Sequence, residues 1–376
     1  MGRIECILSV SLQLFLVAVV CVLLAWPQGQ TSAPGIGVSG NKIIATTEGT
    51  LGLHAVSAGQ VLDLRGLNFS GSEYTCSGGT GFWDNPTGNQ TTINHMRNDW
   101  HANVIRLPLN EECWLGVNGV PPATSGAKYQ NAMSTFVNLA TASGMVVEVD
   151  LHFGSGGSGN PKDDNYPGLD ADHAPAFWQS VANSFKGNPS VIFNLINEPH
   201  DSGSISWACY LNGGCTVKGG TGSWTVVGTQ SVVDTIRATG ATNPIIIAGL
   251  NWSNDLTQWL QWKPTDSANA IIAGAHNYFD NLGCQDPACW TRVWQNIQNN
   301  GYPVLVDELG QFKRCDHSKI DLLMNWADAA HPPIGYWAWA FTVASCTRGP
   351  SLIIKGNGTP TQTYGQGFHD HLRAVQ

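Results

Sequence analysis

The amino-acid sequence predicts an α/β fold in the form of a closed (β/α)8 barrel of the TIM type. Short β-branched runs alternate with amphipathic stretches along the chain, and eight such runs follow one another without a break in composition. This alternation is typical of a parallel sheet with crossover helices, and eight units favour closure into a barrel. A doubly wound open sheet is the alternative, but the glycines of the segment 154–159 open no helix in the G-x-G-x-x-G spacing.

Each element is placed by its pattern of apolar residues. The predicted strands are Val61–Leu67, Asn103–Leu109, Met145–His152, Val191–Asn197, Pro244–Leu250, Ala270–His276, Pro303–Glu308 and Ile334–Phe341. The predicted helices are Tyr129–Ser143, Ala174–Phe185, Val226–Ala238, Trp290–Asn299 and Lys319–Ala330. Before the first strand, the segment Ser39–Leu64 is expected to form a small hairpin that plugs the bottom of the barrel.

The first 33 residues differ from the rest of the chain. Arg3 precedes a nearly uncharged run from Ile7 to Leu24, and small polar residues follow up to Ala33. This pattern predicts a signal peptide at 1–33 that is cut near Ala33, with an uncleaved membrane anchor as the alternative. Either interpretation places residues 34–376, which we expect to form one domain, outside the cytoplasm, and cleavage would leave a secreted protein without a membrane contact.

Composition excludes one class of partner. Charged residues make up 12% of the 376 residues, and the formal net charge is −9 with no cluster of Lys or Arg. Such a chain lacks the basic surface that a phosphate backbone requires, so we expect no binding to nucleic acid. The 15 Trp residues favour another ligand, because an indole ring exposed on a loop can stack on the apolar face of a sugar.

The cysteines fit an oxidising compartment. Ten are present, and removal of Cys6 and Cys21 with the signal peptide leaves eight. Short spacing favours the bridges Cys209–Cys215 and Cys284–Cys289, which leaves Cys76–Cys113 and Cys315–Cys346 as the weaker pairings. Zinc is the alternative for clustered cysteines, but the sequence has no C-x-x-C pair.

Polar residues end most of the predicted strands. In a (β/α)8 barrel the active site lies at the carboxyl ends of the strands, so these residues are the ones to inspect. They are Arg106, Asp150 and His152, Asn197 and Glu198, His276 and Tyr278, and Glu308, followed by Trp337 and Trp339 on the last strand.

Glu198 and Glu308 are the candidate catalytic pair. They end two separate strands, and cleavage of an acetal needs one carboxyl group as proton donor and one to meet the oxocarbenium-like centre. Arg106 and Tyr278 could keep Glu308 ionised, whereas Glu198, shielded among aromatic rings, would hold its proton. The sequence therefore predicts different roles for the two glutamates.

These residues resemble glycoside hydrolase family 5, the cellulase-type barrels. The motifs are Asn-Val-Ile-Arg106-Leu-Pro, Asp-Leu-His152, Asn197-Glu198-Pro-His, His276-Asn-Tyr278, Val-Asp-Glu308-Leu-Gly and Tyr-Trp337-Ala-Trp339, in the order of the family and over nearly all of the mature chain. The resemblance implies that Glu198 is the general acid/base and Glu308 the nucleophile. It also implies that Asn197 bonds the sugar 2-hydroxyl and that Arg106 and Tyr278 support Glu308.

Further roles follow from the same resemblance. His152 and His276 would line the sugar subsite before the scissile bond, and a Trp of the last strand would be its platform, for which we favour Trp337 over Trp339. One departure concerns Asp307, since the family often has Thr or Gly there. Strand alternation allows only one of Asp307 and Glu308 to point inward, and the motif favours Glu308.

The resulting hypothesis is a secreted, monomeric endo-β-1,4-glucanase that retains anomeric configuration and acts on β-glucan. The sequence signals no cofactor and no metal site, since no H-E-x-x-H or comparable spacing occurs. A β-mannanase, β-1,3-glucanase or xyloglucanase on the same fold, and a non-catalytic carbohydrate-binding barrel, are the alternatives. Trp114, Trp207, Trp252 and Trp290 are expected to be outer sugar platforms.

Overall fold

The computed structural model describes residues 32–154, 156, 167–200, 205–219, 222–279, 283–311 and 315–375. The predicted signal peptide, apart from Ser32 and Ala33, lies outside this part of the chain, as do Gly157 and Gly159 of the segment 154–159. Among the helices that the structure does describe, none combines the length and the hydropathy needed to span a bilayer.

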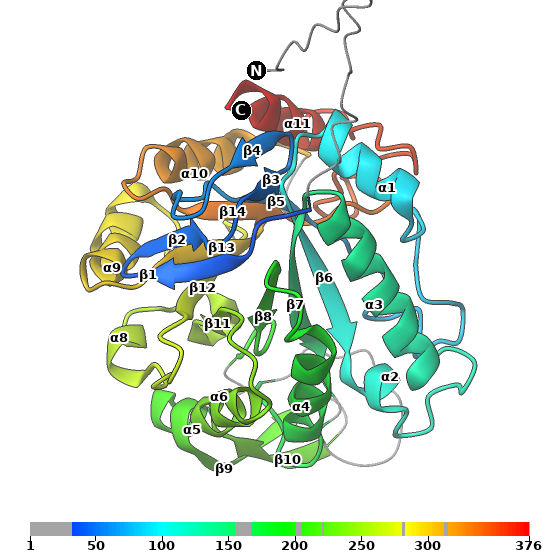
Figure 1. The fold of residues 1–376 in the computed structure, drawn as a ribbon, viewed down its shortest axis with the longest axis vertical. Helices are drawn as coiled ribbons and strands as arrows, with labels where there is room; N and C mark the ends of the chain where they lie inside the picture. The colour runs from blue at the N-terminus through cyan, green and yellow to red at the C-terminus, as the bar shows by residue number, and fades with distance from the viewer. Residues whose placement is uncertain are drawn as a thin grey trace, which may run out of the picture.

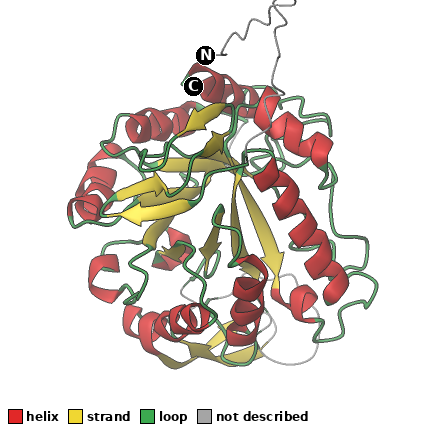
Figure 2. Cartoon of the chain, viewed as in Figure 1, coloured by secondary structure: helices red, strands yellow, loops and turns green. Residues whose placement is uncertain are grey.

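Eight parallel strands close into the barrel that the sequence predicts (Figures 1 and 2). Neighbouring strands follow chain order, and the last one pairs with the first. The strands are β5 (Arg65–Asn68), β6 (Val104–Asn110), β7 (Val146–Phe153), β8 (Val191–Asn194), β11 (Ile245–Ala248), β12 (Ile271–Asn277), β13 (Val304–Leu309) and β14 (Gly335–Ala338). All eight predicted strands are present, although β8 ends three residues early, so Asn197 and Glu198 lie in the loop that follows it.

Helices and one further hairpin surround the barrel. The described helices are α1 (Gln90–Asn94), η1 (His95–Asp99), α2 (Glu111–Leu115), α3 (Ala127–Ala142), α4 (Ala174–Phe185), α5 (Trp207–Asn212), α6 (Thr229–Ala238), α7 (Leu250–Ser253), α8 (Trp259–Trp262), α9 (Pro287–Asn299), α10 (Ser318–Asp328) and α11 (Tyr364–Ala374). The hairpin consists of β9 (Gly213–Gly219) and β10 (Gly222–Val227), which pair antiparallel.

Two helix starts show why the predicted boundaries shift. Asp286 caps α9, since its carboxylate accepts a hydrogen bond from the Cys289 amide at 2.9 Å, and Pro287 suits the first turn, so the helix begins three residues before the predicted start. Helix α6 begins three residues late because Val226 belongs to β10, where it also bridges to Asp170.

The amino-terminal segment closes the bottom of the barrel with two hairpins. They are formed by β1 (Ile36–Ser39) with β2 (Lys42–Ala45), and by β3 (Gly49–Leu51) with β4 (His54–Val56), at the end where β5 and β6 begin (Figure 1). Their buried side chains share one apolar cluster with residues near the starts of the barrel strands: Ile36, Ile43, Ala45, Leu51, Val56, Leu62, Leu64, Val104, Val146, Ile192, Ile246, Ile272, Leu305 and Trp337. The expected plug is present, as two hairpins rather than one.

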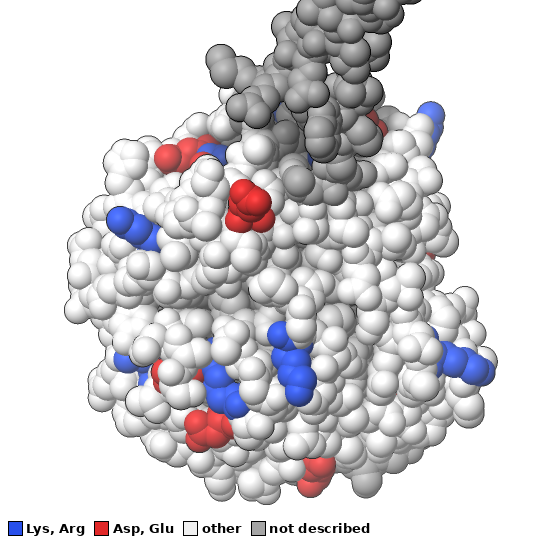
Figure 3. Space-filling model, in the orientation of Figure 1, with Lys and Arg blue, Asp and Glu red and all other residues white. Residues whose placement is uncertain are grey.

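Four disulfides tie the loops to the barrel. The pairs are Cys76–Cys113, Cys209–Cys215, Cys284–Cys289 and Cys315–Cys346, as the sequence predicts. On the face drawn in Figure 3, the surface carries few charges, and single charged side chains are separated by wide uncharged areas.

Candidate active site

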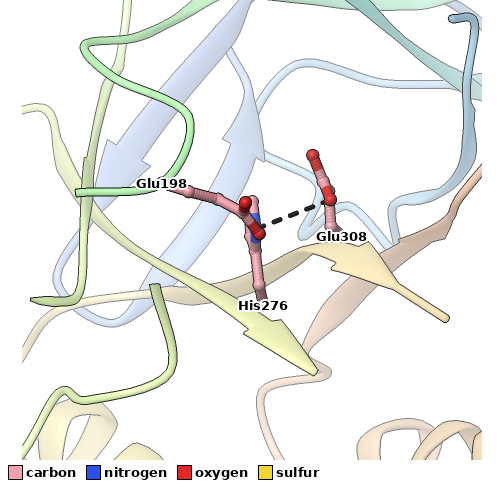
Figure 4. A group of neighbouring side chains, drawn as sticks. All are labelled: Glu198, His276 and Glu308. Carbon is pink, nitrogen blue, oxygen red and sulfur yellow. Dashed lines mark hydrogen bonds and ion pairs between the residues drawn. The ribbon is translucent and has the colours of Figure 1, made fainter. Parts of the chain in front are cut away.

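The residues predicted from strand ends meet at the carboxyl end of the barrel. Glu198 comes from the loop after β8, His276 from β12 and Glu308 from β13, and Figure 4 shows the three side chains pointing toward one another. One carboxylate oxygen of each glutamate and one ring nitrogen of His276 lie within 4.8 Å of one another. His276 Nδ1 lies 2.9 Å from Glu198 Oε1 and 3.6 Å from Glu308 Oε2.

Glu308 is held at both of its oxygens. Arg106 Nη1 donates a hydrogen bond to Oε1 at 2.5 Å, and the hydroxyl of Tyr278 donates a short hydrogen bond to Oε2. Burial, followed by the charge of Glu308, raises the pKa of Tyr278 well above its ordinary value, so the phenol stays protonated and remains a donor. The side chain of Glu308 is 4% exposed and that of Glu198 is 13% exposed.

Arg106 is the centre of a buried polar network. Its Nε donates to Glu148 at 2.8 Å, its Nη1 also reaches Asn68 at 3.0 Å, and its Nη2 lies 3.1 Å from Asp150. Burial disfavours the charge, but Asp150, Glu308 and Glu148 together raise the pKa of Arg106 well above its ordinary value. The guanidinium therefore remains charged, and its planar fork fixes the direction of the Glu308 carboxylate.

Asn197 and His152 form the opposite wall. Asn197 Oδ1 accepts a hydrogen bond from Arg106 Nη2 at 2.8 Å, and its Nδ2 lies 3.3 Å from His152 Nε2. His152 Nδ1 lies 2.9 Å from Asp150 Oδ2. Burial lowers the pKa of His152, but the charge and hydrogen bond of Asp150, together with the charges of Glu73 and Glu308, outweigh it, so the net shift is upward. The ring of Trp339 stacks on His152 with centroids 5.2 Å apart and planes 14° from parallel.

Trp337 does not fit the role of sugar platform. Its side chain is fully buried in the cluster that fills the barrel bottom, and its indole N–H donates to Glu148 Oε2 at 2.9 Å. A side chain without exposed surface offers no face to a sugar, so the choice of Trp337 is wrong. Trp339, the alternative, is half-buried on the loop after β14 and adjoins His152.

Asp307 and Glu308 both point into the barrel, which strand alternation does not allow. The reason is a bulge in β13: Ala275 pairs with Val306 and His276 with Glu308, so Asp307 is an extra residue. Its Oδ2 accepts a hydrogen bond from Asn194 Nδ2 at 2.6 Å and lies 3.8 Å from His276 Nε2. The expectation that one of the two acids faces outward is therefore wrong.

Sequence reasoning missed Glu148, which bonds Arg106, Asn194 and Trp337. A signal was present, since Glu148, Asp150 and His152 alternate with apolar residues along β7 and so share its inward face. Burial, and then the charge of Asp307, raises the pKa of Glu148 to about 8.

The expected outer platforms divide into two groups. Trp114 and Trp290 are fully buried, so they offer no sugar a surface, and Trp207 is 7% exposed. Trp252 is half-buried and stacks on His200, with centroids 3.8 Å apart and planes 5° from parallel. It belongs to a left-handed turn in which Asn251, Trp252 and Ser253 have φ of 54°, 59° and 57°.

That turn is held against the loop that carries Glu198. The amide of Trp252 donates to the Pro199 carbonyl at 3.1 Å, and the Ser253 hydroxyl donates to the Asn197 carbonyl at 2.8 Å. A residue other than glycine is destabilised by roughly 1–2 kcal/mol in this conformation. The two hydrogen bonds offset this strain and hold Trp252 beside the loop that carries Glu198.

The same three side chains that form the centre could also hold a cation. Among the described residues, Glu198, His276 and Glu308 are the one group whose donor atoms have the spacing of a metal site. A cation there would displace the contact between His276 Nδ1 and Glu198 Oε1. The expected absence of a metal stays a prediction.

Known proteins resemble this chain in sequence. The model of the cellulases of glycosyl hydrolase family 5 matches residues 62–342. Endoglucanase 5 of Pectobacterium carotovorum subsp. carotovorum is 25% identical over 367 residues, which are 92% of this chain and 62% of that protein. The manganese dependent endoglucanase Eg5A of Phanerodontia chrysosporium is 29% identical over 323 residues, 75% of this chain and 73% of that protein.

Solved structures resemble it in fold. The β-glucanase SdGluc5_26A of Saccharophagus degradans, in complex with cellotetraose, has a TM-score of 0.66 at 20% identity and covers 94% of this chain, with 99% of its own length matched. The catalytic domain of Thermobifida fusca endoglucanase Cel5A has a TM-score of 0.59 at 18% identity, covering 90% of this chain and 97% of that domain. The solved structures show the fold, and the family match, which spans well over half of the chain, shows that the chain belongs to the cellulases of glycosyl hydrolase family 5.

Proposed function

We propose that this protein is a secreted endo-β-1,4-glucanase that cleaves its substrate with retention of configuration. The observation that carries the proposal is the pair Glu198 and Glu308, which bring one carboxylate oxygen each to within 4.8 Å of the other across the mouth of the barrel. Retaining glycosidases have carboxyl groups about 5–5.5 Å apart, whereas inverting enzymes need roughly 6.5–9.5 Å to admit a water molecule. The short separation supports double displacement.

Glu308 is the proposed nucleophile. Arg106 and Tyr278 occupy one oxygen each, which stabilises the carboxylate and directs it without adding a proton. In the first step a Glu308 oxygen attacks the anomeric carbon as the bond to the leaving oxygen breaks, and an ester to the sugar forms.

Glu198 is the proposed general acid and base. It is the more exposed of the two carboxyl groups, and the contact with His276 Nδ1 holds it toward Glu308. In the first step Glu198 gives its proton to the leaving oxygen, and in the second it takes a proton from the water that cleaves the ester. One carboxyl group serves both steps, so the protein returns to its starting state.

The proposed substrate is a β-1,4-linked glucan. Trp339 stacks on His152, so its ring can serve as the platform for the sugar before the scissile bond, while Asn197 and His276 offer hydrogen-bonding groups nearby. Trp252, which stacks on His200, lies on the Glu198 side of the site and can bind the part of the glucan that leaves after cleavage. Names of the relatives favour glucan, since several are endoglucanases and one related structure holds cellotetraose.

Trapping the ester tests the role of Glu308. A 2-deoxy-2-fluoro β-cellobioside with an activated leaving group should label the protein once, and mass spectrometry of its peptides should place the label on Glu308. Glu308→Gln should remain unlabelled, whereas the matched control Glu48→Gln, which changes an exposed glutamate far from the site, should be labelled like the wild type. Label on any other residue would refute the assignment.

Glu198 and the substrate need separate measurements. In Glu198→Ala, added azide should restore turnover of an activated substrate and give a β-glycosyl azide, because azide attacks the ester without a general base. The rates at which the wild type hydrolyses carboxymethylcellulose, mannan, laminarin and xyloglucan should be compared. Activity on mannan alone, or a first product of inverted configuration, would overturn the proposal.

Secretion and domain organisation are also proposed here. The four disulfides are compatible with an oxidising compartment, and residues 34–376 are proposed to act as one monomeric catalytic domain. The mass of protein recovered from culture medium should correspond to a chain that starts near Ala33 or Pro34. A chain retained in membranes with its first 33 residues would instead support the anchor.

A further inference from the structure

The imidazole of His276 has a carboxylate at each edge. On one side Nδ1 faces Glu198 Oε1 at 2.9 Å and Glu308 Oε2 at 3.6 Å, and on the other Nε2 faces Asp307 Oδ2 at 3.8 Å (Figure 4 shows the first side). A neutral imidazole has one N–H, whereas the imidazolium offers a proton to both edges. Burial disfavours the charge, but Glu308, Asp307 and Glu198 outweigh it and raise the pKa of His276 to about 10.

Asp307 is built into this place by three features of the chain. The bulge in β13 turns its side chain inward beside that of Glu308. Asn194 Nδ2 donates to its Oδ2 at 2.6 Å and fixes the carboxylate. Gly274 leaves it room, since a Cβ at that position would lie 3.1 Å from Asp307 Oδ1 and 2.5 Å from Ile246 Cγ2. Asp307 itself is fully buried, so a sugar cannot reach it.

We propose that Asp307 is a positioning residue of the active site, which keeps His276 doubly protonated and its Nδ1–H directed at Glu198 through both steps of hydrolysis. The inference rests on the proposed function. The charged and titratable groups around the ring are Glu198, Asp307 and Glu308, with Arg106 and Tyr278 beyond Glu308 as its partners.

The role of Asp307 is greatest in the second step. Formation of the sugar ester removes the negative charge of Glu308. Asp307 and Glu198 are then the two carboxylates that remain beside His276. Without Asp307, the imidazolium can pass its Nδ1 proton to Glu198, which leaves a neutral imidazole and a protonated carboxyl group. Glu198 would then be unable to take the proton from the attacking water, and the ester would persist.

Asp307→Asn tests this, because the amide has the same shape and keeps an acceptor for Asn194. With 2,4-dinitrophenyl β-cellobioside, we expect kcat to fall at least 10-fold and a burst of close to one dinitrophenolate per protein, since release of the leaving group outpaces cleavage of the ester. The ¹⁵N signals of His276, assigned from those lost in His276→Gln, should show two protonated nitrogens at pH 8 in the wild type and loss of one proton in the variant.

The matched control is Asp266→Asn. Asp266 is a half-buried acid that bonds Arg237 outside the barrel, at 2.6 and 2.9 Å. This variant should have a lower melting temperature than the wild type. It should give no more burst than the wild type, and its His276 signals should be unchanged.

Two outcomes would overturn the proposal. One is a fall in kcat for Asp307→Asn without a burst and with unchanged His276 signals, which is what a purely structural role predicts. The other outcome is measured on the wild type alone, so it does not depend on whether a variant folds. If His276 of the wild type is neutral at pH 8, the proposed role of Asp307 is contradicted directly. Failure of the proposed function would give a different result: the wild type would cleave no glucan, while the His276 signals would still depend on Asp307.

Discussion

At the scale of single residues, the hydroxyl of Tyr278 controls one oxygen of Glu308. Tyr278→Phe removes this donor and little volume, so kcat should fall about 10- to 100-fold, as expected for a hydrogen bond to a charged group worth roughly 1.5–3 kcal/mol. KM should change less. Steady-state kinetics on a soluble glucan measure both constants. The control is Tyr74→Phe, because the Tyr74 hydroxyl also bonds a carboxylate, at 2.5 Å, but that of Asp84 rather than Glu198 or Glu308. Equal kcat in the two variants would contradict the role of Tyr278.

Trp337 and Trp339 are two residues apart and should respond in opposite ways. Trp337→Phe leaves Glu148 without one buried donor, which costs about 1–3 kcal/mol, so the melting temperature should fall. Trp339→Ala removes a half-buried ring and should weaken binding of cello-oligosaccharides with a smaller thermal shift. Calorimetric melting and titration with cellotetraose on both variants measure the two effects. A wild-type affinity in Trp339→Ala would exclude it as the platform.

The sequence predicted where Arg106, Asn197, His152, His276 and Tyr278 would meet, because a barrel brings the ends of its strands together. It could not place Trp337 and Asp307. The error over Asp307 depends on which way a strand residue points, and one extra residue in β13 changes that direction without any mark in the local pattern. The error over Trp337 depends on depth, because Trp337 lies two residues before Trp339 on the chain and belongs to the cluster at the barrel bottom. Contacts between distant strands, such as Asn194 with Asp307, decide it.

At the scale of elements, the disulfides should stabilise the loops according to the length of chain they close. Cys76–Cys113 spans 37 residues and Cys284–Cys289 spans 5, for which chain entropy gives about 4 and 2 kcal/mol respectively. Replacing both cysteines of each pair by Ala should therefore lower the midpoint of urea unfolding more for the first pair. A larger loss for the second pair would show that loop entropy does not govern these bridges.

Element boundaries were predictable where a helix or strand carries its own signal. Helix α4 begins and ends where its apolar periodicity predicts, with Phe177, Trp178 and Val181 on the buried side. Helix α6 was extended too far because Val226 fits a helical pattern equally well, and its pairing in β10 depends on a second strand. Local patterns do not contain such partners.

At the scale of the whole molecule, stability should fall in alkaline solution because of the centre of the barrel. The pKa of His276 is raised from 6.5 to about 10, so its contribution is complete below pH 6.5 and is lost as the pH rises through 10. Each pKa unit corresponds to roughly 1.4 kcal/mol. Urea unfolding between pH 7 and 10 should show this decline in the wild type, and His276→Gln should flatten it. A constant free energy of unfolding over this range would contradict the assignment.

The plug formed by β1 to β4 has a consequence for the order of folding. It packs on β6, β7, β8, β11, β12 and β13 through Val104, Val146, Ile192, Ile246, Ile272 and Leu305, and these strands come together only when the barrel closes. We therefore expect the first described residues to leave the ribosome to find their final contacts after nearly all of the others have been made. Synthesis of this chain begins at the amino terminus, and we expect its folding to finish there.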